Sequence, residues 1–504
     1  MRLRDRILRV LAVVLCAALP LSFYAVGDVT DTFPGFLTFV KRDSGSALGV
    51  PARGERFPQR KDPKLVTATA SERDVAAEKA SAQAVKQVGE TLPAPGSYAV
   101  SVIDADTGQS TLEHDAATPR TPASTLKLLT AMSALEALDP DTHLTTTARL
   151  KGDTLTLIGG GDMLLGVGPA TPGVNGRASL AALADATAEN VKKAGGKPIT
   201  LHFDDSLFAN APLNPAWKEN GPAGGWVAPI TPLAVNRGDV AGVYGPKQVD
   251  PSLHAAQEFA RLLRERGVAI TGEPTRAPAP RDGTDASVAS ASVGELVSHT
   301  LQHSDNTVAE VLGRLVALHD GISPTPQGAV EAVEKRIAGL AKKYNLQLDP
   351  ITLYDTSGLS VDSRISPRTL ARLLALVASG KDPRLTPISR DLPIAKLTGT
   401  LAKRFDLPET SPGAGLVRGK TGYLGGNTTL AGIGIGPGGR LVAYSVVVYG
   451  FDPKLGLEAR AKVDRLASAV LGVGGLPVSK PESPSTPVPQ TAPPGRKEPA
   501  RRGA

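Results

Sequence analysis

Three short motifs, set far apart along the chain, constrain its fold more than any other feature of the sequence. They are Ser124-Thr125-Leu126-Lys127, Ser304-Asp305-Asn306 and Lys420-Thr421-Gly422. Each is short enough to occur by chance, but their order and local contexts together are specific. A fold that uses all three must bring the beginning, middle and end of the chain to one place. We therefore expect a single site assembled from distant segments.

The first motif places a serine and a lysine three positions apart. Apolar residues at helical spacing predict a helix over 124–138, so Lys127 lies on the same face as Ser124 and reaches its hydroxyl. Lysine acts as a base only where burial or a second cation lowers its pKa, and Lys420 is the candidate cation. We expect Ser124 to be a nucleophile and Lys127 its base. Taken alone, the pair also fits a capping serine followed by a surface lysine.

The second motif is predicted in a turn after a helix that begins at a capping box, Ser292-Val293-Gly294-Glu295. In that turn Asn306 can hold Lys127, and Ser304 can pass a proton to a leaving group. A turn that only caps the next helix is the alternative, and both roles can hold at once.

The third motif follows a short apolar stretch and is predicted on a strand. Gly422 leaves room for an extended peptide beside that strand, and the backbone N–H groups of Tyr423 and Ser124 can form an oxyanion hole. Strand alternation puts Tyr423 on the same face as Thr421, so we expect its ring in the groove. An ordinary strand end is the alternative for this motif alone.

These motifs resemble those of the penicillin-binding proteins and β-lactamases. The segment Asp355-Thr356-Ser357-Gly358-Leu359-Ser360 resembles the D-G-S-G-L-S segment of the family, with Thr356 in place of a glycine. Gly159-Gly160-Gly161-Asp162 resembles a segment at the start of an insert. The long separation of the first two motifs is similar to that of the class C low-molecular-mass penicillin-binding proteins and unlike that of a class A β-lactamase.

The resemblance implies a D-alanyl-D-alanine carboxypeptidase, with D,D-endopeptidase action left open. It implies peptidoglycan stem peptides ending in D-Ala-D-Ala as substrates, an acyl-serine intermediate and acylation by β-lactams, without a cofactor or a metal. Lys420 and Thr421 are then expected to bind the terminal carboxylate, and Asn306 the substrate amide. The family usually has a small Thr or Ser where this chain has Tyr423.

The expected fold is mixed α/β, with an antiparallel sheet flanked by helices and a strand-rich inserted domain. Strands are predicted near both ends of the globular region, with helices between them. The predicted organisation is a linker over 28–90 with a short helix in 71–88, a catalytic domain in two parts (91–140 and 291–476), an inserted domain over 141–290, and a Pro-rich basic tail over 477–504.

Residues 1–27 have the pattern of an export signal. Four arginines precede an apolar run from Val10 to Leu21, and small residues follow it. Whether the segment is cleaved or serves as a membrane anchor stays open. Cys16, the single cysteine, lies inside it, so an exported part has no thiol. We expect an extracytoplasmic protein, anchored to the membrane or secreted into the cell wall.

Parts of the sequence also fit two other function classes. His299 and His303 stand at i, i+4 with Glu310 downstream, which is a possible zinc carboxypeptidase pattern, but the adjacent glutamate of H-E-x-x-H is missing. A non-catalytic penicillin- or wall-binding sensor is the second alternative, and the complete motif set counts against it. The formal charge of +7 comes with no central basic run interleaved with aromatics, so nucleic acid is not an expected partner.

Overall fold

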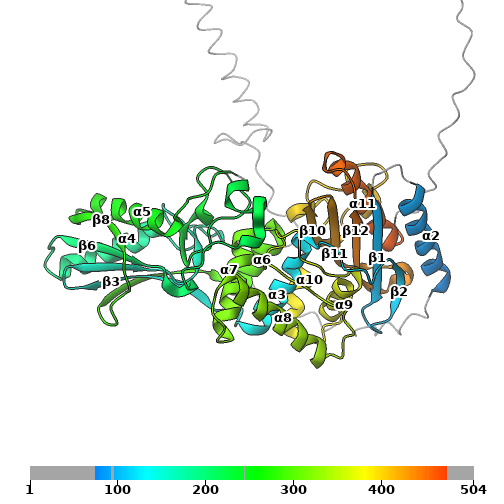
Figure 1. Ribbon diagram of the computed structural model, residues 1–504, viewed down its shortest axis with the longest axis horizontal. Coiled ribbons are helices and arrows are strands. Elements are labelled where there is room, and N and C mark those ends of the chain that lie inside the picture. The colour runs from blue at the N-terminus through cyan, green and yellow to red at the C-terminus, as the bar shows by residue number, and fades with distance from the viewer. Residues whose placement is uncertain (1–73, 92–95, 243–244, 474–504) are drawn as a thin grey trace, which may run out of the picture. The chain divides into compact units, whose positions relative to one another are not determined.

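The computed structural model describes residues 74–91, 96–242 and 245–473 (Figure 1). The predicted export segment (1–27) and the predicted tail (477–504) lie outside these residues. Within the part of the chain that is described, no helix is long and apolar enough to cross a membrane.

One antiparallel sheet joins the two ends of the described chain, in the order β10-β11-β12-β1-β2 (Figure 1). Its strands are β1 (Ser97–Asp104), β2 (Ser110–His114), β10 (Arg418–Leu424), β11 (Asn427–Ile435) and β12 (Leu441–Tyr449). The central strands β1 and β12 pair with Val100 opposite Val446, and both strands are apolar because helices cover both faces of the sheet. The predicted mixed α/β fold class is confirmed.

Alternate side chains of these strands point to opposite faces of the sheet and pack in two separate cores. On one face, Val102 and Tyr444 pack with α11 (Gly456–Val470). On the other face, Ile103 and Ala443 pack with α9 (Pro367–Ala378). The remaining helices of this larger core are α3 (Lys127–Ala137), α6 (Val293–His303), α7 (Asn306–His319), α8 (Pro326–Lys343) and α10 (Thr386–Asp391).

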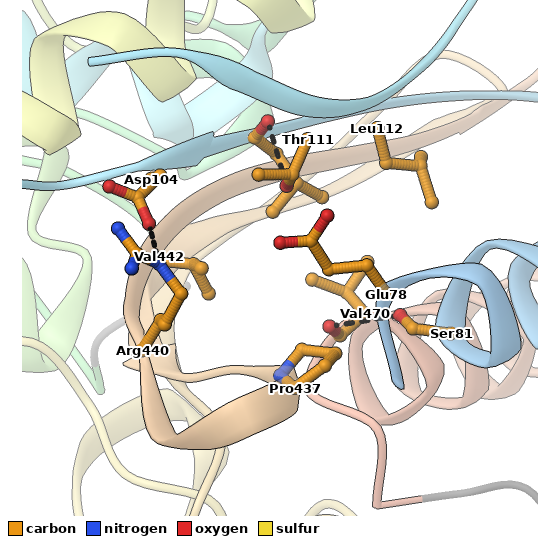
Figure 2. A pocket seen from close by; sticks show the side chains of 10 residues that line it. Glu78, Ser81, Asp104, Thr111, Leu112, Pro437, Arg440, Val442 and Val470 are labelled. Carbon is orange, nitrogen blue, oxygen red and sulfur yellow. Dashed lines mark hydrogen bonds and ion pairs between the residues drawn. The ribbon is translucent and has the colours of Figure 1, made fainter. Parts of the chain in front are cut away.

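Helix α2 (Val75–Thr91) packs on α11, although residues 28–90 were assigned to a linker. Ser81, Val85 and Gly89 are buried at intervals of one helical turn, and the Ser81 hydroxyl donates to the Ala469 carbonyl at 2.8 Å. Figure 2 shows Glu78 of α2 beside a cavity of about 20 Å³ between α2 and the sheet, room for about one water. The packing face of this helix consists largely of small residues, so its sequence shows little apolar periodicity. The other predicted domain boundaries stay predictions.

A second sheet, ordered β8-β6-β4-β3-β9, lies within the range expected to be an insert. Its strands β4, β6 and β8 run parallel, and β3 pairs antiparallel with β4 and β9. Helices α4 and α5 cover it and close a separate apolar core. The bounds are β3 (His143–Lys151), β4 (Thr154–Ile158), α4 (Leu180–Lys193), β6 (Ile199–Asp204), α5 (Pro251–Glu265), β8 (Ile270–Arg276) and β9 (Thr284–Ser292), with a parallel pair β5 (Asp162–Leu165) and β7 (Leu233–Val235) beside them.

The segment between β6 and β7 returns from this second sheet to the helical core. Trp217 is buried there, and its indole N–H donates to Glu310 of α7 at 3.4 Å. Nearby, the Trp226 carbonyl accepts a hydrogen bond from Asn306 at 2.8 Å. This return segment therefore supplies one wall of the region where the three motifs meet.

Candidate active site

Ser124 and Lys127 lie where a 3₁₀ turn, η1 (Ala123–Leu126), runs directly into α3. Lys127 is fully buried, and its Nζ lies 2.9 Å from Ser124 Oγ. The residue before the serine, Ala123, has φ +47°, a left-handed conformation that is strained for a residue with a side chain. The predicted proximity of the two side chains is thus observed, and the backbone that presents the serine is held in a sparsely populated conformation.

The other neighbours of Lys127 decide how its amine is oriented. Nζ lies 2.6 Å from Asn306 Oδ1 and 2.6 Å from the Ser357 carbonyl oxygen. Both oxygens can only accept hydrogen bonds, so they take the two N–H bonds of a neutral amine. The remaining lone pair of Nζ then points at the Ser124 hydroxyl. This arrangement is suited to removing the proton from Ser124.

Asn306 is held in that orientation by the ends of two helices. Helix α6 begins at the predicted capping box, with Ser292 as its N-cap, and ends at Ser304, which has φ +55°. Asp305 then caps α7 by accepting from the Val308 N–H at 3.0 Å. Because the Asn306 amide nitrogen donates to the Trp226 carbonyl, its oxygen must face Lys127. The turn is therefore both a helix cap and part of the site.

Lys420 reaches the same place from strand β10. It is fully buried, and its Nζ lies 2.8 Å from Ser304 Oγ and 2.9 Å from the Thr421 carbonyl oxygen. From the sequence we expect the Lys420 charge, together with the Thr421 hydroxyl, to bind the terminal carboxylate of the substrate, and this stays a prediction. The structure places the Lys420 amine against Ser304, where it can exchange a proton with that hydroxyl.

Burial lowers the pKa of both lysines. The pKa of Lys127 falls to about 8 because desolvation outweighs the nearby acids Asp355, Asp305 and Glu310, which raise it. The pKa of Lys420 is lowered well below its ordinary value by burial first and then by the Lys127 and Arg404 cations. Since repulsion between two amines is mutual, a proton on one disfavours a proton on the other. With a pKa of about 8, the Lys127 amine is half neutral near pH 8, and its neutral fraction falls as the pH drops below that value.

A tight loop that follows the Asp355 carboxyl braces the Lys127 side of the site. Asp355 accepts from the N–H groups of Gly358 at 3.0 Å and Ser360 at 2.7 Å. Glu310 accepts from the Ser357 hydroxyl at 2.6 Å. A Cβ on Gly358 would lie 2.0 Å from the Ala123 carbonyl oxygen, so only glycine lets the loop lie against the turn that carries the nucleophile. The two acids thus fix the Ser357 carbonyl that orients Lys127.

Strand β10 runs directly beside the nucleophile. A Cβ on Gly422 would lie 3.0 Å from the Ser124 nitrogen and 2.2 Å from the Thr429 hydroxyl oxygen, so a side chain at this position would collide. The close approach brings the strand backbone next to the Ser124 N–H. This is the neighbourhood that an oxyanion hole formed by Ser124 and Tyr423 requires.

A groove of about 520 Å³ opens over Ser124. Its lining comes from all three motif regions and from the return segment, including Trp226, Leu359 and Leu424. At the β10 end, the Thr421 hydroxyl donates to the Thr400 hydroxyl at 2.8 Å, and Arg404 and Arg460 also line the groove. The motif residues Ser124, Ser304, Asn306, Thr421, Gly422 and Tyr423 lie along it, with Lys127 and Lys420 buried beneath.

The model of the D-Ala-D-Ala carboxypeptidase 3 (S13) family matches residues 81–249 and 243–470. The chain belongs to this family. It is 31% identical to carboxypeptidase DacB of Mycolicibacterium smegmatis, over 74% of this chain and 80% of that protein. A carboxypeptidase of Mycobacterium tuberculosis is also 31% identical, over 75% of this chain and 80% of its own length. The resemblance to class C low-molecular-mass penicillin-binding proteins is confirmed.

Solved structures show the same fold. Penicillin-binding protein 4 (DacB) from Haemophilus influenzae matches with a TM-score of 0.59 at 20% identity, over 76% of this chain and 97% of that one. A second structure of that protein, in complex with a β-lactam, matches equally well, with a TM-score of 0.59. This S13 chain therefore has the architecture of penicillin-binding protein 4.

Tyr423 lines the groove, as expected from strand alternation, but its ring is anchored at the rim. Its hydroxyl donates to the Pro453 carbonyl at 3.1 Å, its ring centroid lies 6.2 Å from that of Phe451, and 43% of the residue is exposed. These two contacts hold the ring against the turn before α11. In this S13 protein the Tyr423 ring therefore lies at the edge of the groove, and Gly422 lines it next to Ser124.

The sequence-based site missed Thr400, Arg404 and Arg460, and it assigned Glu310 only to a possible zinc site. The Glu310 carboxylate instead accepts hydrogen bonds from the Thr356 N–H and the Ser357 hydroxyl beneath the groove. His299 Nε2 lies 3.1 Å from Asp305 Oδ2. Among the residues described, no three His, Cys, Asp or Glu side chains are grouped so that they could hold a metal ion. The zinc interpretation therefore lacks a ligand set in this part of the chain. In the sequence, the segment 355–360 indicated the loop that Glu310 holds through Ser357.

Proposed function

We propose that this chain is a serine-type D-alanyl-D-alanine carboxypeptidase that acts on peptidoglycan stem peptides. The observation that carries the proposal is the environment of Lys127. Its Nζ lies 2.9 Å from Ser124 Oγ, and two acceptor-only oxygens lie 2.6 Å from the same nitrogen, so in the neutral amine the lone pair faces the nucleophile. Membership of the S13 family supports the same substrate class.

In the proposed acylation step, Lys127 takes the Ser124 proton as Oγ attacks the carbonyl carbon of the penultimate D-alanine. The N–H groups of Ser124 and Tyr423 stabilise the oxyanion. When the tetrahedral intermediate collapses, the C–N bond breaks, Ser304 delivers a proton to the leaving amine, and Lys420, 2.8 Å away, reprotonates Ser304. The proton that Lys127 took from Ser124 replaces the one that Lys420 gave, so Lys127 is neutral again. Water then attacks the acyl-serine with Lys127 again as the base, which releases the shortened peptide and restores Ser124.

A β-lactam follows the first half of this path. Attack by Ser124 opens the lactam ring, and the amine stays attached to the acyl group, so no leaving group departs. We propose β-lactams as covalent ligands of Ser124 on this ground. Cross-linked peptides present the same D-alanine acyl donor, and D,D-endopeptidase action therefore uses the same atoms.

The substrate class places the proposed activity outside the cytoplasmic membrane. We therefore keep the interpretation of residues 1–27 as an export segment, either cleaved or retained as an anchor, as part of the proposal. Protease accessibility of the protein on intact cells, compared before and after removal of residues 1–27, tests it. A protein that stays protected in both forms contradicts export.

The deciding experiment combines labelled penicillin with a pentapeptide ending in D-Ala-D-Ala. We expect the label on Ser124 by mass spectrometry and release of one D-alanine per peptide. Ser124→Ala should lose both, whereas Ser133→Ala, on the helix α3 that follows the nucleophile and bonded to the Val333 carbonyl, should keep both. Label without peptide turnover would favour the penicillin-sensing alternative, and loss of turnover with a chelator would favour the zinc alternative.

A further inference from the structure

The groove contains a cation for which neither the three motifs nor the proposed mechanism gives a role. Arg460, on α11, lines the groove beside Tyr423. Its side chain is half-buried and has no hydrogen bond or ion pair among the described residues. Burial first and then the Arg404 cation lower the pKa of Arg460, and the Asp464 carboxylate opposes them.

The other cations near Arg460 are already engaged. Arg404 forms an ion pair with Asp464 through two of its nitrogens. Lys420 lies beneath the groove with its amine against Ser304 and the Thr421 carbonyl. The amine of Lys420 thus bonds the proton-transfer hydroxyl. A second positive partner would orient an anionic substrate group at this end of the groove.

Two threonine hydroxyls line the same groove as the Arg460 guanidinium. Thr421 and Thr400 line the groove and are bonded to each other at 2.8 Å. At the next outward-facing position of β10, Tyr423 directs its hydroxyl to the Pro453 carbonyl. That hydroxyl is therefore turned away from the groove, and a carboxylate held by Thr421 has Arg460 as its available charged donor.

We propose that the Arg460 guanidinium binds the α-carboxylate of the leaving D-amino acid, beside the hydroxyls of Thr421 and Thr400. The inference rests on the proposed peptidase function and adds a specificity residue to it. A guanidinium presents two parallel N–H bonds to a carboxylate, which fixes the orientation of the leaving residue as well as its charge. The leaving amine is then held where Ser304 can protonate it.

The carboxylate in question is common to two substrate forms. A terminal D-alanine carries it, and so does the D-centre of a diamino acid that is joined to D-alanine in a cross-link. Arg460 therefore selects for a free α-carboxylate next to the scissile amide, whatever side chain that residue bears. A peptide whose terminal carboxylate is capped as an amide should be discriminated against.

The test compares kcat/KM for a D-Ala-D-Ala peptide and for its C-terminal amide in wild type, Arg460→Gln and Arg460→Lys. We expect Arg460→Gln to lose roughly 10- to 100-fold on the free acid and to change little on the amide, so that the preference between them shrinks. Arg460→Lys should recover part of the preference. The control is Arg465→Ala on the same helix, where Arg465 pairs with Glu409 at 2.8 Å and does not line the groove.

An unchanged acid-to-amide preference in Arg460→Gln overturns the inference. An equal loss on both substrates also overturns it, because that outcome indicates damage to the groove, and the melting temperature of each variant is measured alongside. Failure of the proposed function looks different: the wild type itself would not turn over the free acid and would not be acylated at Ser124.

Discussion

The two ends of the active-site groove are built in opposite ways. At the buried end, Lys127 and Lys420 have no exposed surface, and their amines contact fixed oxygens of Ser124, Asn306, Ser357 and Ser304. At the rim, Tyr423 is 43% and Trp226 47% exposed, and Arg460 keeps a guanidinium that no described residue bonds. The buried end is fully organised before a substrate arrives, whereas the rim offers groups that a substrate can complete.

This difference separates the groups that transfer protons from the groups that select the substrate. A buried amine left without its partners costs much more free energy than a half-exposed one, so the proton-transfer groups tolerate little change. Rim residues can differ between family members with smaller effects. Substitutions at the two ends should therefore differ in size and also in what they alter: rate and pH dependence at the buried end, and preference among substrates at the rim.

The largest effect is expected at Lys127. Lys127→Ala removes the base and should lower the rate of acylation by roughly 10²- to 10⁴-fold. In the wild type the neutral amine is the active form, so the acylation rate should rise with pH and level off above a pKa of about 8. Stopped-flow acylation by a chromogenic β-lactam across pH measures both.

The matched control for Lys127 is Lys462→Ala. Lys462 is also a buried lysine, with its Nζ 3.1 Å from the Gly96 carbonyl oxygen, but it lies away from the groove. We expect Lys462→Ala to acylate at the wild-type rate and with the wild-type dependence on pH. Acylation of Lys127→Ala at the wild-type rate would show that another group removes the serine proton.

A smaller and more specific effect is expected at Glu310. Its negative charge raises the pKa of Lys127, so Glu310→Gln should lower that pKa and move the rising limb of the pH profile to lower pH. The amide oxygen can still accept from the Ser357 hydroxyl, so the loop should persist. The measurement is the pH dependence of acylation together with the melting temperature.

Glu334→Gln is the control for this shift. Glu334 is half-buried and accepts from the Leu353 N–H at 3.0 Å, outside the groove. Its substitution should leave the limb in place. If Glu310→Gln leaves the limb unmoved or shifts it to higher pH, the acids behind Ser357 do not set the protonation of Lys127.

The same contrast explains what the sequence could predict. The buried end is encoded locally: Ser124 and Lys127 share one helix face, a capping box starts the helix that leads to Ser304, and Gly422 marks the strand beside the nucleophile. Each relation spans only a few residues, so spacing alone reveals it. The antiparallel strands at the end of the chain were predictable for the same reason.

The rim depends on packing between distant elements. Arg460 reaches the groove only because α11 lies across β11 and β12, and Thr400 meets Thr421 across a loop that has no motif. Likewise, no spacing reveals that the Lys420 amine contacts the Ser304 hydroxyl. Helix α2 was assigned to a linker because its packing face consists largely of small residues, and such a face gives little apolar periodicity.

The smallest effect is expected at Tyr423, where the comparison between the ends is sharpest. Its ring lines the groove, but its hydroxyl and its aromatic partner hold it against the Pro453 turn. Tyr423→Phe removes one half-exposed hydrogen bond and should cost about 0.5–1.5 kcal/mol of stability, with the acylation rate unchanged.

Tyr423→Thr also removes the ring, so it should widen the rim and speed acylation by bulky β-lactams several-fold more than by small ones. Acylation rates for a bulky and a small β-lactam, measured with the melting temperature, separate the two roles. A lower melting temperature with the same rate ratio would mean that the ring only supports the turn, and a general loss of rate would place Tyr423 with the buried end. The expected outcome, a change of preference without a change of pH dependence, is the behaviour of a residue at the rim.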